Sequence, residues 1–247
     1  MNLPSIRCTA VLVFIFMIPA QGIGNQSIAE PAAPLERPVV VELFTSQGCS
    51  SCPPADAILG ELASKNNVIA LGFHVDYWDS IGWRDRFSMP EATERQHRYV
   101  EALQLSSAFT PQIVINGRRS LVGSDRQRIA AAIVETSQEA VQIEAAIARD
   151  QLVIALPDGD NRSHFDVITV AYLAQSTTKV GSGENSGRTL TEFNVVRQFR
   201  RVGTWDGKAR TFQIPVKSFP SDASRVAVLV QQANEGPIAG AVAASLR

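Results

Sequence analysis

Residues 39–64 of the chain read VVVELFTSQGCSSCPPADAILGELAS, which joins an apolar run, a short turn with two cysteines and a helical pattern. The run over residues 39–44 contains β-branched residues and one charge, Glu42, so we expect a buried strand. The two prolines after the second cysteine fit the first turn of a helix. The apolar spacing beyond them predicts a helix over residues 49–64.

The alternation of buried strand and helix continues beyond this stretch. Residues 68–75 read VIALGFHV and predict a second buried strand. A strand, a helix and a strand in this order predict a right-handed parallel crossover. Residues 76–87 form an aromatic loop, and good helix formers then predict a helix over residues 90–103.

A β-hairpin and a last helix are expected next. Apolar runs at residues 112–116 and 120–122 flank Asn116-Gly117, and Asn-Gly in this position is typical of a hairpin. Ser124 and Gln127 have the spacing of a capping box, which predicts a helix that ends near residue 137.

The period of the apolar residues changes to two from about residue 141. Regular short apolar runs with turn residues between them predict an antiparallel β unit of roughly 100 residues. The glycines and polar residues at 180–187 predict a flexible loop within it. The pattern leaves open whether this unit is an independent domain or a sheet packed onto the first half.

The N-terminus has the layout of an export signal. One positive charge, an apolar core of about a dozen residues and a small-residue stretch predict a cleaved signal peptide over residues 1–24. The core is shorter than the ~18 to 20 residues that span a bilayer, so we expect no stable membrane anchor. Residues 25–37 predict a flexible lead-in. The mature protein is therefore expected in the periplasm or secreted, with Cys49 and Cys52 as its two remaining cysteines.

Composition and charge narrow the class of partner. The chain has 247 residues with a formal net charge of -1 and a pI near 6.3. This balance gives no long-range attraction to phosphate backbones or anionic membranes, so nucleic acid is not expected as a partner.

The cysteine pair predicts thiol–disulfide exchange. A Cys-x-x-Cys at a helix start places the first thiol where the helix dipole favours negative charge, so Cys49 is expected to have the lower pKa and the greater exposure. Cys49 is then the nucleophile, and Cys52 is the resolver that attacks the mixed disulfide. A zinc site needs further ligands, and only histidines and acids remain to supply them. A structural disulfide also stays open, although so small a loop contributes only about 2 kcal/mol.

Three segments together resemble the thioredoxin superfamily: Val40-Val-Glu42-Leu-Phe, Cys49-Ser-Ser-Cys52, and Phe109-Thr110-Pro111-Gln112-Ile-Val-Ile-Asn116-Gly117. The last segment is similar to glutaredoxins. The resemblance implies that Pro111 is cis and lies beside the disulfide, and that the backbone of Thr110 pairs with substrate. A simple proline at the start of a strand is the alternative.

More closely, the segments at residues 42–56, 74–79, 82–84, 183–191 and 194–197 resemble a secreted thioredoxin-like family catalogued as domain of unknown function 1223. The resemblance runs from about residue 38 to the C-terminus. It implies an α/β thioredoxin-like fold with an inserted helix, followed by a C-terminal antiparallel β unit. The corresponding limits are 38–138 for the thioredoxin-like domain and 139–247 for the β-rich unit. Gly48 stands where thioredoxin has a tryptophan, and Ser50-Ser51 replaces Gly-Pro.

Several polar and aromatic residues could tune this site. Glu42 lies near the position of thioredoxin's buried proton-relay aspartate, but a glutamate at an edge or one satisfied by a hydrogen bond fits the pattern equally. His74, Asp76, Trp78 and Trp83 follow the second strand, at the sheet end where open α/β folds bind ligands. They could contact substrate, or simply pack within a folded loop.

Three residues of the β unit are further candidates. The family resemblance suggests that Arg188, Thr189 and Arg197 close over the site from the β unit. A salt-bridge network between the two parts of the chain explains the same residues.

The sequence thus predicts an exported thiol–disulfide oxidoreductase that uses Cys49, Cys52 and Glu42 without a metal or an organic cofactor. The expected substrate is a protein or small-molecule thiol or disulfide, and the redox partner is unspecified. The serines between the cysteines add no positive charge, which favours a reductase or isomerase over a strong oxidant. The alternatives are a binding module with a structural disulfide and a metal carrier.

Overall fold

The computed structural model describes residues 38–136, 141–159 and 164–246. The predicted signal peptide and lead-in, residues 1–37, lie outside the described residues. None of the described helices combines the length and the apolar character needed to cross a membrane. The first half contains β1 (Val39–Thr45), α1 (Pro53–Ala63), β2 (Val68–His74), α2 (Pro90–Ala102), β3 (Gln112–Ile115), β4 (Arg119–Val122) and α3 (Arg126–Glu135). The second half contains β5 (Glu144–Ala148), β6 (Gln151–Leu156), β7 (Phe165–Lys179), β8 (Thr189–Trp205), β9 (Arg210–Pro215), a 3-10 turn (Val216–Ser218), β10 (Arg225–Gln232) and β11 (Ile238–Ser245).

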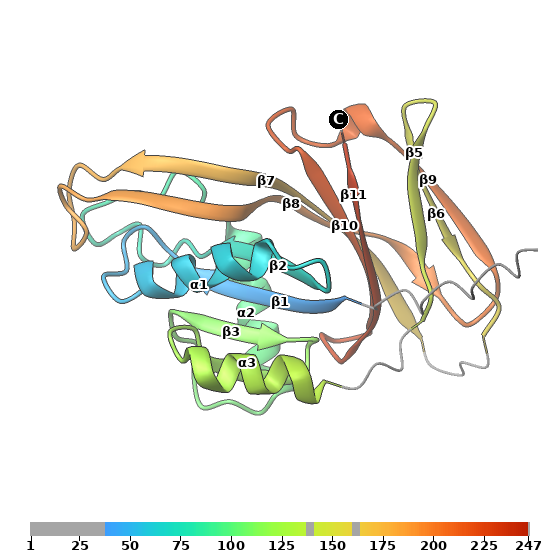
Figure 1. The fold of residues 1–247 in the computed structure, drawn as a ribbon, viewed down its shortest axis with the longest axis horizontal. Coiled ribbons are helices and arrows are strands. Elements are labelled where there is room, and N and C mark those ends of the chain that lie inside the picture. The colour runs from blue at the N-terminus through green and yellow to red at the C-terminus, as the bar shows by residue number, and fades with distance from the viewer. Residues whose placement is uncertain (1–37, 137–140, 160–163, 247) are drawn as a thin grey trace, which may run out of the picture. The chain divides into compact units, whose positions relative to one another are not determined.

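An eight-stranded mixed sheet forms the centre of the fold, in the order β11-β10-β7-β8-β2-β1-β3-β4 (Figure 1). Strand β1 pairs in parallel with β2 and antiparallel with β3, and β3 pairs antiparallel with β4. The expected α/β thioredoxin-like core with a following antiparallel β unit is confirmed. The two strands predicted to be buried, β1 and β2, are buried along their whole length.

The two faces of β1 are covered by different helices. Val39, Val41 and Leu43 pack against buried residues of α1 and α3. Val40 and Phe44 pack against Tyr99 of α2 on the opposite face. Because side chains alternate along a strand, each helix covers the face to which alternate residues of β1 point.

The antiparallel unit extends the same sheet. Strands β7 and β8 form a long hairpin, and Val195 of β8 pairs in parallel with Gly72 of β2. A Cβ at Gly72 would lie 3.1 Å from the backbone oxygen of Phe193, a tight contact, so glycine favours the close approach of β8. A separate three-stranded sheet, β5-β6-β9, packs its apolar residues with those of β7, β10 and β11. The domain limits at 138 and 139 stay a prediction, because one sheet runs through both parts.

Local predictions hold with small corrections. The hairpin is confirmed, with Asn116 and Gly117 both at positive φ, 45° and 64°. The last helix begins one residue later than expected, because Asp125, and not Ser124, accepts the capping hydrogen bond from the Arg128 N–H. The predicted flexible loop at 180–187 is a closed turn, in which the N–H of Gly187 donates to Val180.

Candidate functional site

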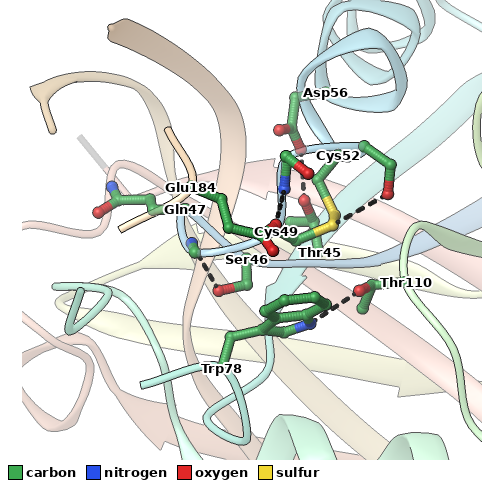
Figure 2. Close-up of a disulfide and its surroundings, with 12 residues drawn as sticks. Thr45, Ser46, Gln47, Cys49, Cys52, Asp56, Trp78, Thr110 and Glu184 are labelled. Atoms are coloured by element: carbon green, nitrogen blue, oxygen red, sulfur yellow. Dashed lines mark hydrogen bonds between the residues drawn. A yellow bond between two sulfur atoms is a disulfide. The ribbon is translucent and has the colours of Figure 1, made fainter. Parts of the chain in front are cut away.

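The two cysteines form a disulfide in the turn between β1 and α1, with their Cα atoms 5.4 Å apart (Figure 2). The helix begins at Pro53, so Cys52 is its N-cap and Cys49 lies in the turn before it. The prediction of a helix from residue 49 is therefore wrong, because the N–H of Cys52 closes a turn onto the Cys49 carbonyl at 3.2 Å. In this disulfide form both cysteines are 0% exposed, and the greater exposure of Cys49 in the reduced protein stays a prediction.

The start of α1 offers few donors to a thiolate. Pro53 and Pro54 occupy the first two helical positions and have no N–H. The backbone N–H of Ser50 points to the carboxylate of Glu184, 3.1 Å away. The Cys49 sulfur lies 3.4 Å from the hydroxyl of Ser51. The turn is therefore held by neutral contacts and one negative charge.

The loop before β3 lies beside this turn. The Thr110–Pro111 peptide bond is cis, which confirms the first part of the prediction, and the placement of Pro111 beside the disulfide stays a prediction. The indole N–H of Trp78 donates to the Thr110 hydroxyl at 2.9 Å (Figure 2). A Cβ at Gly48 would lie 3.1 Å from Cβ of Trp78, so the glycine allows Trp78 to lie against the turn. Trp78 thus contacts the cysteine turn at Gly48 and joins it to Thr110.

Glu42 is buried, but its carboxylate belongs to a different cluster. It accepts two hydrogen bonds from Arg95, at 2.8 and 3.1 Å, and one from the Tyr99 hydroxyl. These partners lie on α2, so Glu42 points to the face of β1 opposite to α1. The second interpretation of the sequence, a glutamate satisfied by hydrogen bonds, describes its environment.

Asp56 is a buried carboxyl group on the α1 side of β1, and sequence reasoning missed it. It lies on α1 one turn after Cys52, is 8% exposed, and accepts a hydrogen bond from the Thr45 hydroxyl at 2.8 Å (Figure 2). Burial raises the pKa of Asp56 to about 7, although His74 and the Thr45 hydrogen bond each lower it. The sequence pattern could have indicated Asp56, because it lies four residues after Cys52, on the same helix face, and the other inward residues of α1 are apolar.

His74 is fully buried in an ion pair behind the site. Its Nδ1 lies 2.7 Å from the carboxylate of Asp85, which also accepts the backbone N–H of Gln47. Burial alone would lower the pKa of His74, but the charge and hydrogen bond of Asp85 raise it above its ordinary value. Burial would raise the pKa of Asp85, and the same pairing lowers it. His74 therefore supports the turn through Asp85 and Gln47.

Gln47 joins several strands to the cysteine turn. Its side-chain amide donates to Thr178 of β7 and to Glu192 of β8, at 3.0 and 2.7 Å. Its side-chain oxygen accepts the indole N–H of Trp83 at 3.0 Å. Burial raises the pKa of Glu192, against the effect of the Gln47 hydrogen bond. Trp83, predicted as a binding residue, is therefore part of this interior network.

The other predicted residues have varied places. Asp76 accepts a hydrogen bond from the Thr93 hydroxyl of α2 at 2.6 Å. Arg197 is paired with Asp222 at 2.9 Å. An open groove of about 440 Å³ runs beside the turn, lined by Ser50, Pro53, Pro54, Arg188, Thr189 and Leu190. Arg188 and Thr189 thus reach the site, whereas Arg197 is held by its own ion pair.

Among the residues that the structure describes, no group of three or more histidine, cysteine, aspartate or glutamate side chains is placed to hold a metal ion. The chemistry available at the turn is that of the two sulfur atoms, and Asp56, one helical turn after Cys52, is a carboxyl group whose pKa is raised to about 7.

Comparison with known proteins gives one family and two solved structures. A family described as "Protein of unknown function (DUF1223)" matches residues 40–231. The crystal structure of protein AGR_C_4864 from Agrobacterium tumefaciens is similar with a TM-score of 0.72 and 33% sequence identity, over 85% of this chain and 95% of that one. HBP35 of Porphyromonas gingivalis has a TM-score of 0.58 and 14% identity, over 86% of this chain and 76% of its own, which is a similarity of fold. No curated protein matches.

Proposed function

The chain belongs to the family described as protein of unknown function (DUF1223), and we propose that it is a thiol–disulfide oxidoreductase of the thioredoxin superfamily. The observation that carries the proposal is the Cys49–Cys52 disulfide directly before α1, together with a cis Thr110–Pro111 bond in the loop that Trp78 joins to the cysteine turn. The sheet order β2-β1-β3-β4, with helices on both faces of β1, supports the same assignment.

The proposed reaction consists of two exchanges. The Cys49 thiolate attacks one sulfur of a substrate disulfide, forms a mixed disulfide and releases the other sulfur as a thiolate, which takes a proton from water. Cys52 then loses its proton and attacks the Cys49 sulfur, which releases the substrate's second sulfur as a thiol. Two electrons pass from the protein to the substrate. The protein is left with the Cys49–Cys52 disulfide, and an external dithiol reductant restores both thiols.

Asp56 is the group we assign to the proton of Cys52. It lies one turn further along α1, and its pKa of about 7 suits a group that accepts a proton and returns it near neutral pH. In the second exchange Asp56 takes the proton from Cys52 and passes it to the departing substrate sulfur. Glu42 cannot share this role from the opposite face, where it is paired with Arg95.

The surroundings of the turn favour a reductase or isomerase. A strong oxidant owes its potential to a stabilised thiolate in the reduced protein. Here Ser50 and Ser51 bring no positive charge, Pro53 and Pro54 lack N–H groups, and the Glu184 carboxylate lies beside the turn. Arg188 lies on the same groove, but its guanidinium donates to Asn185. A thiolate with so few donors favours transfer of electrons to the substrate.

The sequence and the site support a proposed compartment, cofactor requirement and substrate for this reaction. The N-terminal pattern supports an exported protein of the periplasm or the exterior, where disulfides persist. The two sulfur atoms carry both electrons, so the reaction needs no metal or organic cofactor. The substrate is a protein or small-molecule disulfide, and Trp78 with the Thr110 backbone is the surface we assign to it.

Cys52→Ser tests this function. The variant lacks the resolving sulfur, so the mixed disulfide on Cys49 should accumulate as adducts that disappear on reduction. Cys49→Ser, expressed in the same exported compartment, is the matched control and should form few or none. Non-reducing gels followed by mass spectrometry of the trapped proteins compare the two.

The rival functions give other outcomes. A binding module with a structural disulfide loses at most about 2 kcal/mol of stability in either variant, and the two then behave alike. This rival draws support from the complete burial of both sulfurs. A metal carrier would instead lose Cu(I) or Zn binding in both variants. Indistinguishable serine variants would overturn the oxidoreductase.

A further inference from the structure

The turn between β7 and β8 contacts the cysteine turn, although the two turns are far apart in the sequence. The side-chain amide of Asn185 donates to the backbone carbonyls of Gln47 and Cys49, at 3.0 and 2.9 Å. Asn185 is 0% exposed. Both ends of the short segment that leads into the disulfide are therefore held by one side chain.

The amide of Asn185 is itself oriented by its neighbours. The Arg188 guanidinium donates to its side-chain oxygen at 3.0 Å, so the NH₂ group faces the two carbonyls. The backbone closes around it, because the N–H of Arg188 donates to the Asn185 carbonyl at 3.1 Å. The amide is thus fixed before it meets the cysteine turn.

Two further contacts hold this turn in place. The Glu184 carboxylate accepts the N–H of Ser50, between the two cysteines (Figure 2). Gly183 has φ +74°, and a Cβ there would lie 3.0 Å from Cβ of Trp83. The turn therefore packs on Trp83 at one side and on the cysteine turn at the other.

We propose that Asn185 is a positioning residue that holds the Cys49–Cys52 turn in its covered state, and that the β7–β8 turn moves away to admit the reacting partner. The proposal rests on the proposed function, because it explains how a disulfide with both sulfurs buried can exchange. A thiol must approach along the S–S axis, and no surface of either sulfur is exposed while these contacts are made.

Reduction by a water-soluble phosphine tests the cover without any protein partner. The phosphine attacks one sulfur of the disulfide and gives up two electrons. Water supplies the oxygen of the phosphine oxide, and both cysteines become thiols. Asn185→Ala removes both hydrogen bonds to the turn and should raise the second-order rate of reduction about tenfold, the effect of two neutral hydrogen bonds on local opening. Asn185→Asp, which has the same shape but no donor, should react at least as fast.

Ser186→Ala is the matched control, because its hydroxyl bonds the Gly181 carbonyl within the same turn and is exposed. It should react at the rate of the unmodified protein. In the reduced proteins, alkylation of Cys49 should be faster for both Asn185 variants, and a thermal scan should show them folded at the assay temperature. Equal rates in all four proteins would overturn the proposal.

The two proposals fail separately. If Cys52→Ser forms adducts but the Asn185 variants are reduced at unchanged rates, the proposed role of Asn185 is wrong and the proposed oxidoreductase function stands. If the Asn185 variants are reduced faster but Cys52→Ser forms no adducts, the proposed role of Asn185 stands and the oxidoreductase function is wrong.

Discussion

The two faces of β1 each meet one buried carboxyl, and the two are supported very differently. Glu42 is paired in a bidentate contact with Arg95 and bonded by Tyr99. Asp56 faces the other side with one side-chain partner, the Thr45 hydroxyl. Burial alone therefore does not identify a proton carrier. Glu42 has a buried cation as its partner, whereas Asp56 has a neutral hydroxyl, and burial raises the pKa of Asp56 to about 7.

The largest expected effect comes from breaking the Glu42 pair. Arg95→Met leaves a carboxylate buried without its cation and should lower the free energy of unfolding by about 3–5 kcal/mol. Urea unfolding followed by circular dichroism measures this. Glu42→Leu together with Arg95→Met removes both charges and should recover a substantial part of the loss. A loss below about 1 kcal/mol in the single variant would show that the pair is not the support we describe.

Asp56→Asn should give an effect that depends on pH. The folded protein keeps the Asp56 proton up to a pKa of about 7, whereas the unfolded chain releases it near 3.8. The folded state therefore binds more protons between these values, and its stability should fall by about 3 kcal/mol from pH 4.5 to pH 7.5. The stability of Asp56→Asn should lack this dependence on pH. Urea unfolding at both pH values tests it, with Glu61→Gln, an exposed carboxyl on the same helix, as the control that keeps the slope.

The smallest expected effect is that of Thr45→Val, which has the same shape but cannot donate to Asp56. It should cost about 1 kcal/mol of stability. The loss should be larger at pH 8 than at pH 5, because a hydrogen bond to a charged carboxylate is the stronger one. The same unfolding measurement at the two pH values decides. An equal loss of stability at both pH values would mean that Asp56 does not change its protonation between pH 5 and pH 8, which would contradict its assigned role.

The sequence by itself determined the strand–helix–strand core, the cysteine pair between its first strand and helix, and the Asn-Gly hairpin. The cis bond at Pro111 was expected only from the resemblance to the thioredoxin superfamily. Apolar period, turn residues and proline act over a few neighbouring residues, so their effects can be inferred from the order of residues. The helix start was misplaced for the same local reason, because two prolines after Cys52 begin the helix there and leave Cys49 in the turn.

Only the tertiary structure decided to which face of β1 each buried carboxyl points and which distant side chain bonds the cysteine turn. Glu42 looked suitable by its distance from Cys49 in the chain, but the face to which it points depends on α2 and its Arg95, 53 residues away. Asn185 reaches the Cys49 carbonyl across 136 residues. Its segment looked like a flexible loop because glycines and polar residues dominate it. The pairing of β7 with β8 carries that loop onto the cysteine turn, and no local pattern encodes such a contact.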